Sequence, residues 1–271
     1  MVTGVQWWCS AQGTAWTWRW RPYPGIWLVA LGIASSYWAL TRRIPDTAKA
    51  RSRRVIGWIG VLVVWLSLDW PLGPLAAGYL ASAHAIQFLV LTMGASPLLL
   101  LGLEPGLTSR SEPRGVAWRA WRVLTMPLMA AIVFNVIAAA THVPGVVDGL
   151  MVSQFGAFVL DIAWLVAGVV FWWPVLTSVP RHNFPVLFKV LYIFLGTMIH
   201  SGIAIVMLLA EFPIYSIYQL APPMHGLTAM TDLQIAGGIM EIGGTLIAFG
   251  VMTALFFTWV QQSGAGEREG A

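Results

Sequence analysis

Imidazole, carboxamide and thioether side chains occur in this chain within or next to long apolar stretches. His84 and Gln87 lie one helical turn apart in the apolar segment 78–101, and His200 lies near the middle of segment 186–210. An unpaired polar group in hydrocarbon costs several kcal/mol, so each of these side chains needs a partner. Imidazole suits copper, zinc and iron, whereas thioether favours Cu(I). These residue types therefore indicate a transition-metal site inside a membrane protein.

The candidate ligands come from several segments of the chain. His142 follows the apolar segment 126–141, and Asp232 directly precedes the segment 233–260. No two histidines are neighbours in sequence, so the fold must bring them together. The candidate metal ligands are His84, His142, His200, Met224, His225, Asp232 and Met240, and the supporting polar residues are Gln87, Gln234 and Glu241.

Each of these residues also has a purely structural interpretation. A lone polar side chain inside a membrane can simply hydrogen-bond a neighbouring helix, and this interpretation holds for His200 and Gln87. Methionine fills gaps in apolar bundles, so most of the eleven methionines are expected only to pack. Glu241 lies about two turns into segment 233–260, where a carboxylate is costly and marks a functional site by default. Its structural alternative is a protonated carboxyl or a pair with a buried hydroxyl.

Motifs of the common enzyme classes are missing from the sequence. There is no HExxH, no Gly-rich phosphate loop and no nucleophile elbow, so nothing indicates a hydrolase or an ATPase. The single cysteine, Cys9, excludes an internal disulfide and a CxxC redox or metal motif. We predict that the protein is not an enzyme.

The composition is that of an integral membrane protein. Of the 271 residues, 58% are hydrophobic and only 10% are charged, against about a quarter charged in soluble domains. About twenty apolar residues span a bilayer, and seven segments approach or exceed this length. We therefore predict an all-α bundle of about seven transmembrane helices in a lipid bilayer, formed by segments 23–40, 55–72, 78–101, 126–141, 155–176, 186–210 and 233–260.

The basic residues predict the orientation of this bundle. They concentrate in the loops after the first, third and fifth segments, whereas the loops after the second, fourth and sixth contain none. The positive-inside rule then puts the N-terminus outside and the C-terminus in the cytoplasm, although Arg19 and Arg21 argue the other way. Because the charge is confined to these loops, the basic balance does not indicate nucleic acid as a partner.

The predicted orientation also gives the domain organisation and the side of the site. Residues 1–22 form a Trp-rich interfacial segment on the outer surface, 23–260 the transmembrane domain and 261–271 a disordered cytoplasmic tail. His84, His142 and the loop before segment 233–260 fall in the outer half of the membrane or at its outer boundary. The candidate metal site is therefore expected near the outer face.

Several motifs occur in an order that resembles one known family. They are Ser82-Ala-His84-Ala-Ile-Gln87, His142-Val-Pro144, Phe171-Trp-Trp-Pro174, Pro213-Ile-Tyr215 and Thr231-Asp-Leu-Gln-Ile-Ala-Gly-Gly-Ile-Met240. Over about residues 18–257 the chain resembles the CtaG family of cytochrome c oxidase assembly factors. The resemblance implies a seven-helix protein of the bacterial plasma (inner) membrane that is needed for maturation of a haem–copper oxidase. It also implies the handling of copper destined for that oxidase.

Two positions depart from the family pattern. The family usually has His-x-x-Gln-His in its third helix, whereas this chain has Phe88 in place of the second histidine. It usually has Asp-Gln-Gln at the start of its seventh helix, whereas this chain has Leu233 in place of the first glutamine. If the missing histidine is a ligand, the metal site of this chain is weaker, completed by other residues, or lost.

Two functions from different classes follow. In the first, Cu(I) binds near the outer face between His84 and His142 and passes by ligand exchange to oxidase subunits or other copper chaperones. In the second, the protein is a non-catalytic accessory subunit that docks onto a respiratory complex without a metal. A haem-binding cytochrome is a third class, for which only His84 and His200 are candidate ligands, and we expect no haem.

Overall fold

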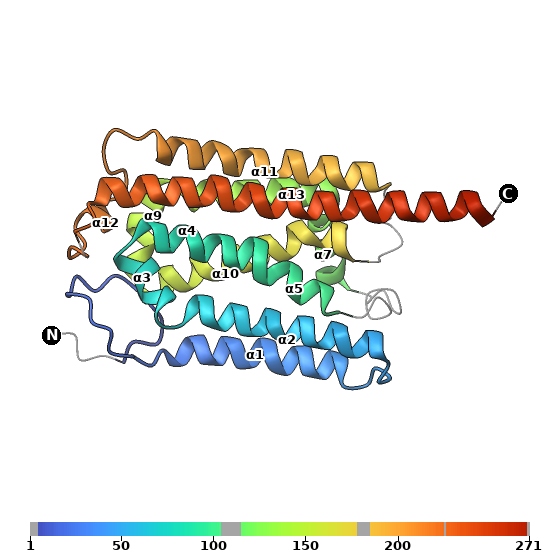
Figure 1. Ribbon diagram of the computed structural model, residues 1–271. Helices are drawn as coiled ribbons and strands as arrows, with labels where there is room; N and C mark the ends of the chain where they lie inside the picture. Colours follow the sequence, from blue (N-terminus) through green and yellow to red (C-terminus); the bar gives the residue numbers. More distant parts are fainter. Residues whose placement is uncertain (1–4, 104–114, 178–184, 225, 270–271) are drawn as a thin grey trace.

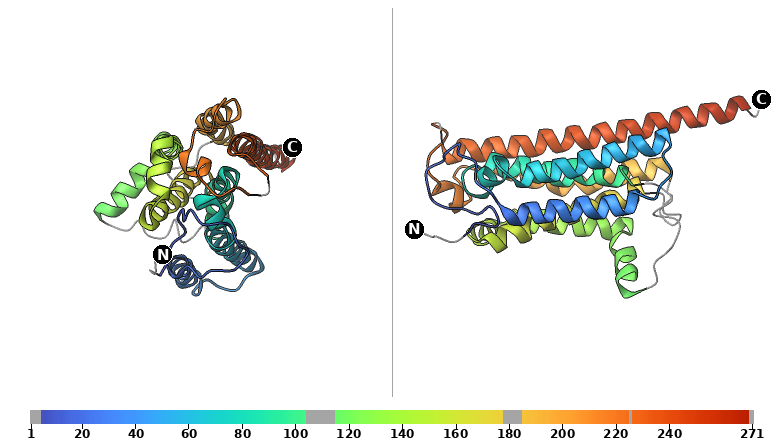
Figure 2. Two further views of the ribbon diagram at one scale, coloured as in Figure 1. Left: turned by 90° about the vertical axis from the view of Figure 1, so that its left-hand side faces the viewer. Right: turned by 90° about the horizontal axis from the view of Figure 1, so that it is seen from below.

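The fold is a single elongated bundle of helices. The computed structural model describes residues 5–103, 115–177, 185–224 and 226–269, and within these ranges it contains helices and no strand. Helices make up 76% of it, which confirms the predicted all-α class. Figures 1 and 2 show the long helices side by side, with residues 5–23 and the short helices α3, α9 and α12 at one end. We call this the N-terminal end of the bundle.

Each of the seven predicted apolar segments falls on helical structure. Five helical stretches are long and apolar enough to cross a membrane, and the count rises to seven if two bent pairs each form one span. The elements are α1 (Pro24–Thr41), α2 (Ala48–Leu68), α3 (Leu72–Gly78), α4 (Ala81–Leu89), η1 (Val90–Ala95), α5 (Ser96–Leu101), α7 (Val116–Leu124), α8 (Pro127–Ala140), α9 (Pro144–Met151), α10 (Gln154–Leu176), α11 (Val186–Leu208), α12 (Ser216–Gln219) and α13 (Ala229–Glu269).

The two bent pairs each have a proline at the bend, where the ring prevents a regular helix from continuing. Pro71 separates α2 from α3, which meet at 45°, and Pro127 begins α8, which meets α7 at 81°. No residue of α7 is buried, and Figure 2 shows this helix projecting sideways from the bundle. An amphipathic helix with arginines on it, lying across the bundle axis, is typical of a segment in the membrane interface.

The helix that carries His84 widens after two turns. Continuous helical backbone runs through α4, the π-helix η1 and α5, and Pro97 has no N–H with which to close a regular turn. The indole nitrogen of Trp172 donates to the Thr92 carbonyl at 3.0 Å, which satisfies an acceptor of the widened turn. A Cβ at Gly168 of α10 would lie 2.4 Å from Ser96 Oγ, so only glycine permits this close approach. The widened turn is thus fixed against α10.

The Trp-rich N-terminal segment is bound to the bundle by hydrogen bonds. The side-chain oxygen of Gln154 accepts from the backbone N–H groups of Trp7 and Trp8 at 2.7 and 3.2 Å. The indole nitrogen of Trp8 donates to Asp161 at 2.8 Å, and the Trp8 side chain has no exposed surface. This part of the segment therefore belongs to the core and does not lie on the surface as predicted.

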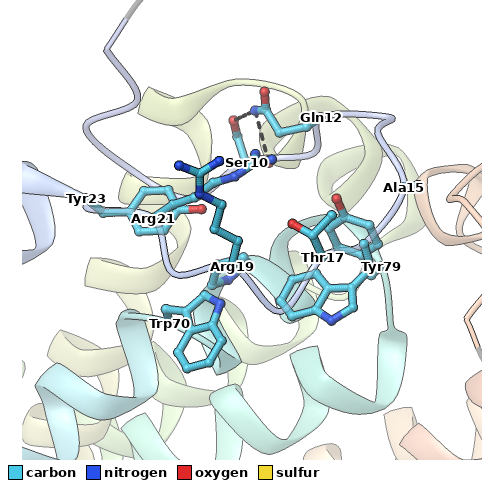
Figure 3. Close-up of a pocket in the computed structure, with 11 residues that line it drawn as sticks. Ser10, Gln12, Ala15, Thr17, Arg19, Arg21, Tyr23, Trp70 and Tyr79 are labelled. Atoms are coloured by element: carbon cyan, nitrogen blue, oxygen red, sulfur yellow. Dashed lines mark hydrogen bonds between the residues drawn. The ribbon is translucent and has the colours of Figure 1, made fainter.

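The rest of the N-terminal segment remains at the surface. Trp18 and Trp20 are 60% and 53% exposed, as an interfacial segment requires. Figure 3 shows the small pocket that the segment forms over Trp70 and Tyr79, with the Gln12 amide donating to the backbone and hydroxyl oxygens of Ser10. Aromatic side chains and arginines share this pocket, which suits a headgroup region.

The last helix continues beyond the predicted transmembrane domain. α13 runs as one helix as far as Glu269 and so includes most of the segment 261–271 that was expected to be a tail. Figure 1 shows α13 running the length of the bundle and extending past every other helix at the end opposite to the N-terminal end. The 41 residues of α13 are thus more than one span requires.

Candidate metal site

Three histidines from separate parts of the chain cluster around Phe88 and Trp164. His84 lies on α4, His142 follows the end of α8, and His200 lies on α11. The ring centroids of His84 and His142 are 6.1 Å apart. The Phe88 ring is 4.8 Å from that of His142 and stacks on that of His200 at 5.6 Å. The fold therefore assembles three of the predicted ligands, with Phe88 between two of them.

These histidines are buried and incompletely hydrogen-bonded. Their exposed fractions are 4% for His84, 6% for His142 and 1% for His200. Among the described residues, neither ring nitrogen of His84 has a hydrogen-bond partner, and neither does Nε2 of His142 or of His200. Buried polar atoms in native proteins are nearly always paired, so a bound water or an ion could complete these nitrogens.

The protonation of His142 leaves one nitrogen available. Its Nδ1 lies 2.7 Å from the carbonyl oxygen of Ala138, which can only accept, so Nδ1 carries the hydrogen. Nε2 then holds a free lone pair, as in metal-binding histidines whose second nitrogen is fixed by a backbone carbonyl. Burial also lowers the pKa of His142 to about 4, which keeps the imidazole neutral at physiological pH. A neutral imidazole is the form that binds a metal.

Aromatic side chains form the walls of this site. The Trp164 ring of α10 is 4.7 Å from His84 and stacks on His142 at 6.1 Å. Its indole nitrogen donates to the Thr141 hydroxyl at 2.9 Å, which fixes the ring beside His142. On another side, the Tyr218 ring of α12 is 5.9 Å from His84. Sequence reasoning missed both residues, because nothing distinguishes Trp164 among sixteen tryptophans or Tyr218 within its loop.

Two predicted site residues have structural partners. Asp232 accepts from the backbone N–H groups of Ala81 and Ser82 and from the Ser82 hydroxyl, so both of its oxygens are engaged at the start of α4. The Gln87 amide donates to the Ser67 carbonyl of α2 at 3.1 Å. These bonds position α4, and with it His84, between α2 and α13.

The other predicted residues of α13 point in different directions. Met240 has no exposed surface and lies in the hydrophobic core, whereas Gln234 is exposed. Glu241 is half-buried and lines a lateral groove of about 1050 Å³ between α11 and α13, and its Oε2 has no partner among the described residues. A Cβ at Gly244 would lie 2.4 Å from the His200 ring, so α13 approaches His200 through a glycine.

The remaining candidates lie near the N-terminal end or outside the described residues. Met224 lines a pocket at the N-terminal end of the bundle, and His225 is not among the described residues. Within the described ranges no three His, Cys, Asp or Glu side chains are grouped closely enough to form a ready metal centre. The site is thus a packed cluster of two to three buried imidazoles among aromatic rings, which suits a soft monovalent ion of low coordination number better than Zn²⁺ with its four ligands.

Comparison with known proteins gives a match at the level of the family. The sequence matches the family model Caa3_CtaG, described as cytochrome c oxidase caa3 assembly factor, over residues 34–262. No curated protein and no solved structure gives a significant match. The matched region contains every helix of the bundle except the first part of α1 and the end of α13, and it includes all three clustered histidines. This chain belongs to the family of cytochrome c oxidase caa3 assembly factors.

Proposed function

We propose that this protein binds Cu(I) between His84 and His142 and passes the ion on during maturation of a haem–copper cytochrome c oxidase. The observation that carries the proposal is the pair of buried imidazoles of His84 and His142, whose ring centroids lie 6.1 Å apart and which have ring nitrogens without a hydrogen-bond partner among the described residues. A metal ion between those nitrogens would satisfy them. The His200 ring stacks on Phe88 and would provide a further nitrogen donor.

The proposed activity is carriage of the ion and not catalysis. Cu(I) would enter and leave by exchange of ligands, with no covalent bond made or broken in a substrate. The partners would be oxidase subunits or other copper chaperones, and the location a bacterial plasma membrane with the histidines towards its outer face. Family membership and the apolar helices support this setting.

Metal binding by purified protein tests the proposal. Wild-type protein is expected to take up Cu(I) from a colorimetric chelator, and the double variant His84→Ala/His142→Ala to lose about tenfold or more in affinity, since ligands are removed. The variant His182→Ala, which changes a histidine of the loop after the fifth predicted span, serves as the control. Equal affinity in all three proteins, or no uptake by the wild type, would contradict the proposal.

One observation favours the accessory-subunit function instead. Phe88 fills the space between His142 and His200, and no group of three ligands exists among the described residues. Under that alternative the double variant keeps full oxidase copper content and activity in cells, and the purified protein holds no metal. A visible spectrum of the purified protein tests the third class, a haem-binding cytochrome. A haem Soret band would contradict both the copper-binding and the accessory-subunit function.

A further inference from the structure

A small pocket lies under the Trp-rich N-terminal segment, at the N-terminal end of the bundle (Figure 3). Two arginines, Arg19 and Arg21, and two tryptophans, Trp16 and Trp70, contribute to its lining. We call it the arginine pocket. Its free volume of about 20 Å³ has room for a single water-sized atom, since a water needs about 10–15 Å³. An occupant would therefore insert one atom and keep its remaining atoms at the mouth.

The two indole N–H groups of this lining have no acceptor. Nε1 of Trp16 and Nε1 of Trp70 are buried, and neither has a hydrogen-bond partner among the described residues. By contrast, the indole nitrogens of Trp27 and Trp65 both donate to Asp69. A buried donor without an acceptor is costly, so the two unpaired indoles indicate that the pocket takes an acceptor from outside the chain.

The two arginines bring positive charge to the same pocket without a carboxylate to balance it. Among the described residues the ion pairs are those of Asp46 with Arg51 and Arg54, and no Asp or Glu contributes to the lining of the pocket. A water could accept from the indoles, but it would leave the charges of Arg19 and Arg21 unbalanced. An anionic oxygen supplies the acceptor and the opposite charge together, and guanidinium groups bind phosphate oxygens especially well.

The place of the pocket in the fold favours a phosphate that belongs to a lipid. Trp18 and Trp20 of the same segment are exposed, as tryptophans at the level of the lipid headgroups are. Headgroup phosphates lie at that level too. Arg19 and Arg21 are also the basic residues that run against the positive-inside rule in the predicted orientation, and a lipid phosphate would give them a function there.

The carboxylate next to Trp70 in the sequence decides which kind of phospholipid fits. One oxygen of Asp69 accepts from the indoles of Trp27 and Trp65, at 2.9 and 3.0 Å. The other accepts from the backbone N–H of Trp70 at 2.8 Å. Neither oxygen is therefore available to the ammonium group of phosphatidylethanolamine. A headgroup that brings no positive charge, such as that of phosphatidylglycerol, suits this lining better.

We propose that the arginine pocket binds the phosphate of an anionic phospholipid such as phosphatidylglycerol. One phosphate oxygen enters the pocket and accepts from the indoles of Trp16 and Trp70. The guanidinium groups of Arg19 and Arg21 bind the other oxygens at the mouth, and the acyl chains stay in the bilayer. The lipid thereby fastens the N-terminal segment to the membrane. The inference is independent of the proposed copper binding, because no histidine contributes to the lining of this pocket.

Lipid binding to the full-length protein in detergent tests this site. Native mass spectrometry resolves each bound lipid, and a titration gives its Kd. Phosphatidylglycerol should bind about tenfold more tightly than phosphatidylethanolamine with the same acyl chains. The double variant Arg19→Gln/Arg21→Gln should lose this preference, because it removes the charge-assisted hydrogen bonds to the phosphate. Arg42→Gln/Arg43→Gln, which removes two arginines after the end of α1, is the matched control and should keep the preference.

A second variant tests the indoles. Trp16→Phe keeps an aromatic ring but removes the N–H, so the affinity for phosphatidylglycerol should fall about fivefold, the factor of one net hydrogen bond. Trp18→Phe changes a tryptophan of the same segment that does not contribute to the lining, and it should leave the affinity unchanged.

Two results would overturn the proposal. Wild-type affinity for phosphatidylglycerol in both the double arginine variant and Trp16→Phe would show that the lipid does not bind in this pocket. Displacement of the lipid by an equal concentration of inorganic phosphate would mean that the pocket binds free phosphate and not a lipid. If the double arginine variant fails to fold, Trp16→Phe decides the question.

Discussion

Position 88 determines how many nitrogen donors the site contains. The phenyl ring of Phe88 contacts His142 at 4.8 Å, stacks on His200 at 5.6 Å and is 1% exposed. A histidine at position 88 would have a ring of similar shape, and its nitrogens would lie among the same neighbours. The CtaG family pattern, which usually has histidine here, would then place four imidazoles in one enclosure, whereas this chain has three.

The first prediction at the scale of single residues is that Phe88→His tightens Cu(I) binding by about tenfold or more, since an added ligand worth ~1.4 kcal/mol changes affinity by that factor. Competition with a Cu(I) chelator measures the affinity. Phe134→His, at an equally buried phenylalanine of α8, is the control and should show no such gain. A similar gain in both variants would mean that any buried histidine binds the ion.

At the scale of elements, one carboxylate connects α13 to α4. The residue before α4, Leu80, offers no side chain to cap the helix. Asp232, in the first turn of α13, supplies the acceptors for the free N–H groups of Ala81 and Ser82. Helix N-termini attract negative charge, so one carboxylate stabilises the starts of two helices at once.

The prediction for this contact concerns stability. Asp232→Ala should lower the free energy of unfolding by about 1 kcal/mol or somewhat more, as the loss of a helix cap does. Thermal unfolding in detergent measures the loss. Thr47→Ala, which removes the side-chain cap of α2, gives the ordinary cost of a cap for comparison. If Asp232→Ala lowered Cu(I) affinity about a hundredfold without destabilising the protein, Asp232 would be a ligand and not a cap.

At the scale of the whole molecule, the charged and polar features separate along the bundle. The loop between α1 and α2 and the helix α7 carry arginines and lie at the end opposite to the histidines (Figure 1). By the positive-inside rule we expect this basic end to face the cytoplasm. The histidine cluster would then face the opposite side.

This orientation predicts the behaviour of reporter fusions. A fluorescent protein fused to the C-terminus should fluoresce, and an alkaline phosphatase fused at the same place should be inactive, because the first folds in the cytoplasm and the second outside it. The reverse result would mean that the protein has the opposite orientation in the membrane, with the histidines on the cytoplasmic side. Fusions in the loop between α11 and α12 provide the opposite expectation within the same protein.

Much of this architecture could be predicted from the sequence because hydrophobic length is a local property. The seven apolar segments fall on helices, and the burial of His84, His142 and His200 follows from their place within or beside such segments. That the three histidines meet required only that a bundle brings their helices together. These features depend on the composition of windows of about twenty residues.

The features that sequence reasoning missed depend on contacts between distant residues. The hydrogen bonds of Asp232 to Ala81 and Ser82 join residues some 150 positions apart, and no local pattern marks the pair. Trp8 was expected at the surface and instead reaches Asp161 in the core. Phe88 could be recognised as a departure, yet its place between two histidines is a property of the packing of α4, α8 and α11.

The length of α13 has a mechanical consequence. At about 1.5 Å per residue its 41 residues measure about 60 Å, roughly twice the hydrocarbon thickness of a bilayer. Its C-terminal end extends past the other helices, at the end of the bundle opposite to the N-terminal end (Figure 1). A small tilt of α13 would therefore displace this free end further than the part of the helix that packs on His200, because displacement grows with distance along a rigid helix.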